Sequence, residues 1–241
     1  MNFVFLDAWH RYLPREGGHL VTVRGGGGRS HLVRVVARRL AADGVPVAVA
    51  AAGNVTEAGF VACPFFELVA GGGARPERIR VVSDGDPAGQ SAEGMDRLGA
   101  ALTDHVLIHE AVGATAADLP RHVSLAITVT GLSDVGRAPT EAATGAEPPP
   151  KAWLTAGDPA PVWSWDGVVA FLAAAAPGGR RPVPHVAALM EVEACADGIG
   201  LFACVERIMT DLAIPLVTLG SASDEGMHLR TACAQPDEEA S

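Results

Sequence analysis

Short runs of β-branched and aliphatic residues alternate along the chain with longer segments in which apolar residues recur every three to four positions. The first pattern predicts strands and the second predicts amphipathic helices. Continuous apolar runs such as residues 45–51 are typical of strands that are buried on both faces. The alternation therefore predicts an α/β domain in three layers, with a mainly parallel sheet joined by crossover helices.

The same pattern places the individual elements and their boundaries. Strands are predicted at residues 19–23, 45–51, 78–83, 105–110, 123–130, 185–190 and 215–219, and helices at residues 30–40, 93–102, 165–175 and 197–212. Residues 1–234 are expected to form a single domain, in which the stretch rich in glycine, proline and alanine at residues 131–161 is a loop-rich excursion. Residues 235–241 are acidic and are expected to form a flexible tail.

Composition and charge exclude several classes of protein. Hydrophobic residues make up 49% of the 241 residues, which is too high a share for a disordered chain. The longest apolar run, residues 168–176, is about half of the ~20 residues that a membrane-spanning helix needs, and the N-terminal residues do not have the pattern of a signal peptide. The formal net charge of −10, without any basic run, argues against nucleic-acid binding. We therefore expect a cytoplasmic protein with neither a membrane nor a nucleic-acid partner.

The four cysteines do not indicate a metal site or a disulfide framework. Their positions, 63, 195, 204 and 233, contain no C-x-x-C pair. We interpret Cys195 and Cys204 as small buried apolar residues.

The turn after the first predicted strand is the strongest candidate site. It reads Val-Arg-Gly-Gly-Gly-Gly-Arg-Ser over residues 23–30 and leads directly into a predicted helix. Consecutive glycines allow backbone conformations in which successive N–H groups point at an anion, and the helix N-terminus adds a partial positive charge. The alternative is that the glycines only form a tight turn between strand and helix. The residues predicted to bind phosphate are Gly25, Gly26, Gly27, Gly28, Arg29 and Ser30.

This loop departs from the phosphate-binding pattern G-x-x-x-x-G-K-[ST] at two positions. Val23 stands where the first glycine belongs, and Arg29 stands where the lysine belongs. Arginine keeps the positive charge, but its planar guanidinium does not fit between two phosphates as an ammonium does. The dinucleotide pattern G-x-G-x-x-G fits less well, because Ser30 or His31 would have to be glycine. An NAD(P)-binding oxidoreductase is therefore the weakest alternative.

Three further segments extend the pattern beyond the glycine loop. They are the Glu110-containing strand end at residues 104–113, the run Val-Thr-Gly-Leu-Ser-Asp-Val-Gly-Arg-Ala-Pro at 129–139, and the strand at 186–193. In order and spacing, over roughly residues 5–220, the chain resembles the accessory proteins of selenium-dependent molybdenum hydroxylases, the YqeC-like family. The resemblance implies a P-loop NTPase-like fold with a short leading helix at residues 3–13. It also implies bound ATP or GTP with Mg²⁺ and a role in maturing a molybdenum hydroxylase, with that enzyme or its maturation factors as partners.

The resemblance assigns further roles near the loop. It implies Ser30 and Glu110 as the Mg²⁺ ligands and Glu193 as part of a base-recognition stretch. From its position alone, Glu110 is equally well a solvent-facing residue at the end of a strand. His105 and His109 lie on the same predicted strand, and we interpret them as satisfied or exposed strand histidines rather than metal ligands.

The chain resembles a divergent member of this family. Arg29 replaces the lysine, Val112 replaces the aspartate of an E-A-D-G segment, and Met190 and Glu191 replace the Asn and Lys of the base-recognition stretch. Only one of the 18 basic residues is a lysine, so composition alone accounts for Arg29 but not for the other departures. Because phosphoryl transfer depends on a lysine and Mg²⁺, we expect at most a weak Mg²⁺-dependent NTPase. The alternative is a non-catalytic binding or scaffold protein that retains the fold.

Overall fold

The computed structural model describes residues 3–6, 12–26, 28–50, 79–82, 92–111, 120–132, 135, 164–176, 183–220 and 229–234. Its strands are β1 (Phe3–Leu6), β2 (His19–Gly26), β3 (Val47–Ala50), β4 (Ile79–Val82), β5 (Val106–Glu110), β6 (Val123–Gly131), β7 (His185–Met190), β8 (Leu216–Gly220) and β9 (Leu229–Ala234). Its helices are α1 (Arg29–Ala42), α3 (Ala92–Ala101), α5 (Trp165–Ala175) and α6 (Gly198–Thr210), with a 3-10 helix η5 (Val192–Ala194).

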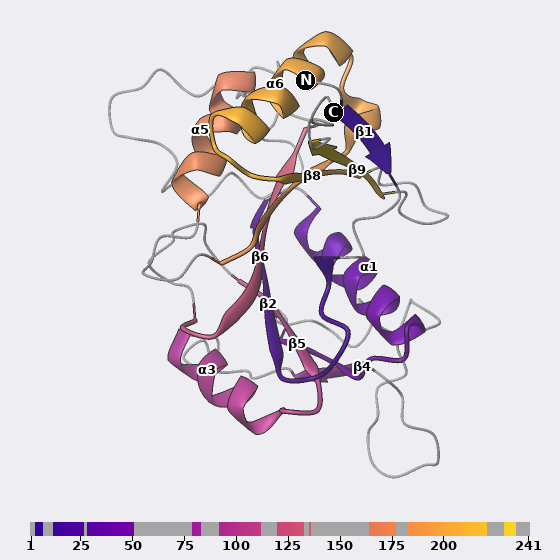
Figure 1. Ribbon diagram of the computed structural model, residues 1–241, viewed down its shortest axis with the longest axis vertical. Coiled ribbons are helices and arrows are strands. Elements are labelled where there is room, and N and C mark those ends of the chain that lie inside the picture. The colour runs from indigo at the N-terminus through magenta and orange to yellow at the C-terminus, as the bar shows by residue number, and fades with distance from the viewer. Residues whose placement is uncertain are drawn as a thin grey trace, which may run out of the picture.

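The strands form one sheet in the spatial order β1-β9-β8-β7-β6-β2-β5-β3-β4, with helices on both faces (Figure 1). All pairings from β4 across to β8 are parallel, and β9 pairs antiparallel with both β8 and β1. The predicted three-layer α/β fold with a mainly parallel sheet is therefore confirmed. Among the described residues, no helix is long and apolar enough to cross a bilayer.

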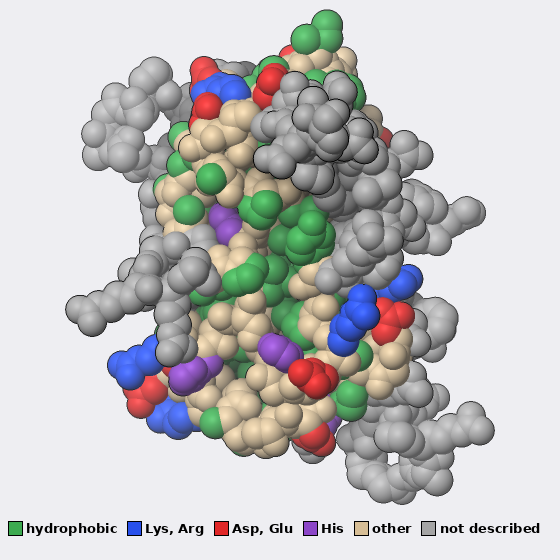
Figure 2. Space-filling model, in the orientation of Figure 1, with side chains coloured by type: hydrophobic (Ala, Val, Ile, Leu, Met, Phe, Trp, Pro, Cys, Tyr) green, Lys and Arg blue, Asp and Glu red, His purple; other side chains and the backbone are tan. Residues whose placement is uncertain are grey.

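The core is divided by the sheet into two sides. On one side, α1 buries Leu32, Val36 and Leu40 against β2, β3 and β5, because these residues recur at the spacing of one helix face. On the other side lie two separate apolar clusters, one beneath α5 and α6 and one beneath α3. Figure 2 shows hydrophobic side chains reaching the surface in the middle of one face of the molecule, with charged side chains around them.

The prediction of a short leading helix at residues 3–13 is wrong for its first residues. Phe3–Leu6 form β1, which pairs with β9 in the register Phe3↔Ala234. An extended segment satisfies its backbone groups by joining the edge of a sheet, and here the partner strand comes from the other end of the chain. β9 itself has no counterpart among the predicted strands. The predicted tail at residues 235–241 lies outside the described residues, as does most of the excursion at 131–161.

Candidate functional site

The glycine loop lies at the carboxyl end of β2, a central strand between β5 and β6. Gly25 has a φ of +105°, and a Cβ built on it would lie 2.0 Å from the carbonyl oxygen of Val129 on β6. Only glycine therefore allows β2 to continue beside β6 at this point. Gly28 also has a left-handed φ, +98°, and stands immediately before α1. Gly27 lies outside the described residues, and Gly26 is the last residue of β2.

The N-terminus of α1 has no cap of its own. Gly28 contributes no side-chain hydrogen bond at the cap position, and the first turn contains no acidic residue. By contrast, Ser164 caps α5 by accepting from the amide of Gly167, and Asp197 caps α6 by accepting from the amide of Gly200. The partial positive charge and the amide donors at the start of α1 are therefore available to an anion from outside the helix.

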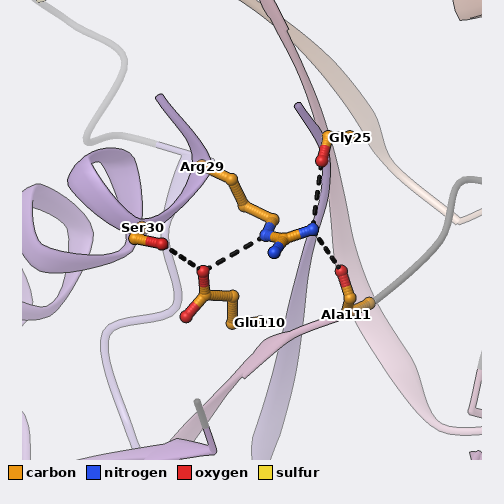
Figure 3. Close-up of polar contacts among 5 residues, drawn as sticks. All are labelled: Gly25, Arg29, Ser30, Glu110 and Ala111. Atoms are coloured by element: carbon orange, nitrogen blue, oxygen red, sulfur yellow. Dashed lines mark hydrogen bonds and ion pairs between the residues drawn. The ribbon is translucent and has the colours of Figure 1, made fainter. Parts of the chain in front are cut away.

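Ser30 and Glu110 meet beside this helix end. Glu110 is the last residue of β5 and pairs in register with Val23, which directly precedes the loop. The Ser30 hydroxyl donates a hydrogen bond of 2.5 Å to Oε1 of Glu110 (Figure 3). The Glu110 side chain is only 2% exposed, so it is not the solvent-facing residue that its position alone allowed. The structure therefore brings together the two residues expected to hold Mg²⁺, and their role as metal ligands stays a prediction.

Arg29 turns back across the loop toward the sheet. Its Nε lies 3.2 Å from Oε1 of Glu110 and forms an ion pair with it. Its Nη1 donates to the carbonyl oxygens of Gly25 at 3.1 Å and Ala111 at 3.0 Å (Figure 3). These three hydrogen bonds use Nε and Nη1, so none of them occupies the Nη2 donor group. The guanidinium ties the loop to the ends of β2 and β5 and neutralises Glu110.

The carboxyl end of β7 also reaches the loop. The Cβ and Cγ of Met190 lie 3.1 and 3.2 Å from the position that a Cβ on Gly28 would take. The next residue, Glu191, has a φ of +60°, and η5 follows with the exposed Glu193. Met190, a departure from the family pattern, therefore packs under the loop. The predicted role of Glu193 stays a prediction.

His109 lies on β5 and His105 directly precedes that strand. No group of three or more His, Cys, Asp or Glu side chains able to hold a metal occurs within the described ranges. Nδ1 of His105 lies 2.6 Å from Oδ1 of Asp104. His109 is buried, and neither ring nitrogen has a hydrogen-bond partner among the described residues, so it is neither satisfied nor exposed as expected. Burial, together with the positive charge of Arg29, lowers the pKa of His109 to about 4.

The oxygen atoms around Ser30 fit Mg²⁺ in part. The Ser30 hydroxyl and the Glu110 carboxylate are the hard ligands that Mg²⁺ prefers, and this ion keeps several water molecules when few protein ligands are present. However, Nε of Arg29 is already 3.2 Å from the carboxylate oxygen that Ser30 contacts. A cation at this position would be repelled by the guanidinium. Val112, the departure at the end of this segment, lies outside the described residues.

Two parts of the site had no counterpart in the sequence pattern. The carbonyl oxygen of Ala111 became a partner of Arg29 only because β5 pairs with β2. Arg24 is buried on the face of the sheet opposite α1. In the sequence, only the alternation of Leu20, Thr22 and Arg24 with Val21 and Val23 indicates that orientation.

Comparison with protein-family models, with curated proteins and with solved structures finds no match. The resemblance to the YqeC-like family stays a prediction, and the function has to be inferred from the geometry of the site.

Proposed function

We propose that the protein binds the phosphate groups of a nucleoside triphosphate, ATP or GTP, at the loop between β2 and α1. The observation that carries this proposal is the contact between Ser30 and Glu110 beside a helix N-terminus without a cap. Backbone amides at a helix N-terminus after a glycine turn bind phosphate through both hydrogen bonds and the helix dipole. The left-handed conformations at Gly25 and Gly28 give the loop the sharp path that such a site requires.

Arg29 supports phosphate binding but not efficient catalysis. Its remaining Nη2 donor suits a phosphate oxygen, while its other donors hold Glu110 and the carbonyl oxygens of Gly25 and Ala111. A P-loop lysine acts as a mobile point charge on the transferring phosphate, whereas this guanidinium is already bound at three acceptors. We therefore propose slow hydrolysis at most.

Mg²⁺ in this proposal is held by the Ser30 hydroxyl and by Glu110, and it would supply charge neutralisation for the phosphates. The ion pair between Arg29 and Glu110 reduces the charge available to the metal. The metal contribution to nucleotide affinity is therefore expected to be small.

The proposed biological role is that of an accessory protein in maturing a molybdenum hydroxylase, with that enzyme or its maturation factors as partners. This role comes from the family resemblance, and it agrees with a site that binds nucleotide without fast turnover. A second candidate is a scaffold that has lost nucleotide binding. It is favoured by the intramolecular bonds of Arg29, which stabilise the loop without any ligand.

Calorimetric titration of ATP, GTP, NAD⁺ and NADP⁺ into the full chain, each with and without Mg²⁺, tests the proposal. Binding of a triphosphate in preference to both dinucleotides supports it. Binding of none of the four ligands supports the scaffold, and a preference for NAD⁺ or NADP⁺ supports an oxidoreductase; either result would overturn the proposal.

A further inference from the structure

The outer face of α6 exposes a stripe of apolar side chains. Among the described residues, three large apolar side chains are exposed, and two of them, Ile199 (85% exposed) and Phe202 (54%), lie three positions apart on α6. Residues three and four positions apart share one face of a helix, so the exposed Ala203 belongs to the same face. Glu206 and Thr210 continue this face and are exposed as well. We call Ile199, Phe202 and Ala203 the α6 stripe.

The opposite face of α6 already packs into the protein. Leu201, Val205 and Ile208 are buried in the apolar cluster beneath α5 and α6. α6 lies beside α5 at one end of the molecule, and hydrophobic side chains protrude from the surface at this end (Figures 1 and 2). The α6 stripe is therefore apolar surface beyond what the core needs, and contact with another surface would remove it from water.

The turn that presents Ile199 is fixed to α5. Asp197 caps α6 by accepting a hydrogen bond of 2.8 Å from the amide of Gly200, and it accepts a second one, of 2.9 Å, from Nε1 of Trp165. A Cβ on Gly200 would lie 2.0 Å from the same Nε1, so only glycine lets the indole lie this close to the turn. Because the turn is held in place before binding, little entropy is lost when a partner docks on it.

Acidic residues border the α6 stripe. Residues 191–211 include five acidic residues and one basic residue, Arg207. Glu193 and Asp197 precede the first turn of α6, and Glu206 lies on the same face as the stripe, all three exposed. The guanidinium of Arg207 already forms ion pairs with two carboxylates. The surface around the stripe therefore attracts a positively charged partner.

We propose that the α6 stripe is the docking surface for a basic amphipathic helix of a partner protein. Apolar side chains at helical spacing pack well against a second helix, whose own side chains enter the grooves beside Ile199 and Phe202. Ala203 is small, so the two helices can approach closely at this point. Lysine or arginine residues beside the apolar face of the partner helix pair with Glu206 and with the acidic residues that precede α6.

The charge around the stripe disfavours two other occupants. A second copy of the chain docked through the same stripe would bring the acidic borders of both copies together, and like charges across an interface oppose association. Helices that bind a bilayer surface have lysine and arginine beside their apolar face, whereas α6 has acidic residues there.

α6 begins near the edge of the sheet that carries the glycine loop. β7 ends at Met190, which packs against Gly28, and η5 leads from there to the first turn of α6. The docked helix would therefore lie toward the same edge of the molecule as the proposed phosphate site. The inference does not depend on nucleotide binding at that site.

Fluorescence anisotropy with two labelled amphipathic helical peptides tests this surface on the full chain. One peptide has a leucine face bordered by lysine, and the other has glutamate in place of each lysine. We expect the leucine–lysine peptide to bind saturably, and the leucine–glutamate peptide to bind at least about tenfold more weakly.

The Ile199→Ser/Phe202→Ser double variant should bind the leucine–lysine peptide at least about tenfold more weakly than wild type, because the complex loses two apolar contacts. Tyr12→Ser is the matched control, since Tyr12 is the third exposed large apolar residue and precedes β2. It should leave the Kd unchanged. Both variants should keep the urea midpoint of wild type, because the substituted side chains are exposed.

Several results would overturn the assignment. No binding of the leucine–lysine peptide by wild type, equal binding by wild type and the double variant, or equal affinity for the two peptides would each do so. A wild-type dimer in sedimentation velocity that dissociates in the double variant would assign the stripe to a second copy. Binding to vesicles of phosphatidylserine and phosphatidylcholine that the double variant loses would assign it to a membrane. A lower urea midpoint of the double variant alone would show that the chain itself covers the stripe.

Discussion

The hydroxyl of Ser30 donates a 2.5 Å hydrogen bond to the buried carboxylate of Glu110, and this joins the first turn of α1 to the carboxyl end of β5. The two residues are 80 positions apart in the chain, and the parallel pairing of β5 with β2 brings them together. Ligands of open parallel sheets bind at this edge.

Removing the charge of Glu110 tests its pairing with Arg29. Glu110→Gln keeps the side-chain shape but leaves the guanidinium of Arg29 without its ion-pair partner. The Arg29 side chain is only 20% exposed, so water compensates this loss in part only. We expect a loss of about 2 kcal/mol in the free energy of unfolding, measured by urea denaturation. The exposed Glu206→Gln on α6 is the control and should change stability by less than about 0.5 kcal/mol. Equal stability of the two variants would contradict the structural role of this ion pair.

Glycine at position 25 is required by the close approach of β6. Gly25→Ala would place a methyl group 2.0 Å from the Val129 carbonyl oxygen in a left-handed conformation, and we expect destabilisation by more than about 3 kcal/mol. Gly99→Ala is the matched control, because its Cβ would meet only a side-chain atom of Leu107 at 4.0 Å within α3. That variant should gain about 0.5–1 kcal/mol, since alanine favours a helix. A Gly25→Ala protein as stable as wild type would show that the loop takes another path.

Stability is expected to fall as the solution is acidified from about pH 6.5 to about pH 4. Burial lowers the pKa of both His109 and His185 to about 4, with Arg29 and Arg24 respectively adding to the effect. Over this range the unfolded chain takes up protons on both residues while the folded chain does not, so unfolding becomes more favourable as pH falls. The two histidines together contribute up to about 2.7 kcal/mol per pH unit.

The contribution of these histidines is measured by comparing wild type with the His109→Asn/His185→Asn double variant in urea at several pH values. The variant should have a shallower pH dependence across this window, whereas the exposed His122→Asn should have the slope of wild type. An unchanged slope in the double variant would show that both histidines titrate normally in the folded protein.

Arg29→Lys should make nucleotide binding depend more on Mg²⁺. A lysine cannot contact Glu110 and the two carbonyl oxygens simultaneously in the fork geometry that Arg29 uses, so Glu110 becomes available to the metal. We expect Mg²⁺ to improve ATP affinity at least about fivefold more in this variant than in wild type, which corresponds to about 1 kcal/mol. Titrations with and without Mg²⁺ measure the effect, with Arg39→Lys at the other end of α1 as control. An identical Mg²⁺ effect in all three proteins would contradict competition between Arg29 and the metal.

Much of the fold follows from local patterns, because periodicity records which face of each element is buried. α5 and β7 have the predicted bounds, and the remaining predicted strands and helices differ from the observed ones by a few residues. β1 and β9 could not be predicted, because their pairing joins the two ends of the chain. Of the site, the glycine loop with Ser30 and Glu110 was predictable.

The orientation of Arg29 was not predictable from the sequence. Two of its acceptors are backbone carbonyl oxygens, which carry no sequence signal and are placed only by the folded sheet. The contact between Met190 and Gly28 likewise depends on β7 ending near the loop, two strands away from β2. The burial of unpaired polar atoms at Thr22, Arg24 and His109 could not be predicted either. It depends on which helices and loops cover each face of the sheet.

Titration of ATP into wild type, Arg29→Ala and Arg39→Ala in the presence of Mg²⁺ tests the central claim most directly. Arg29 and Arg39 lie in the first and last turns of the same helix, so the two variants lose the same charge at opposite ends of α1. We predict that wild type and Arg39→Ala bind ATP with the same Kd, and that Arg29→Ala binds at least about tenfold more weakly, a loss of about 1.4 kcal/mol. Equal affinity in all three proteins, or no binding by wild type, would contradict phosphate binding at this loop.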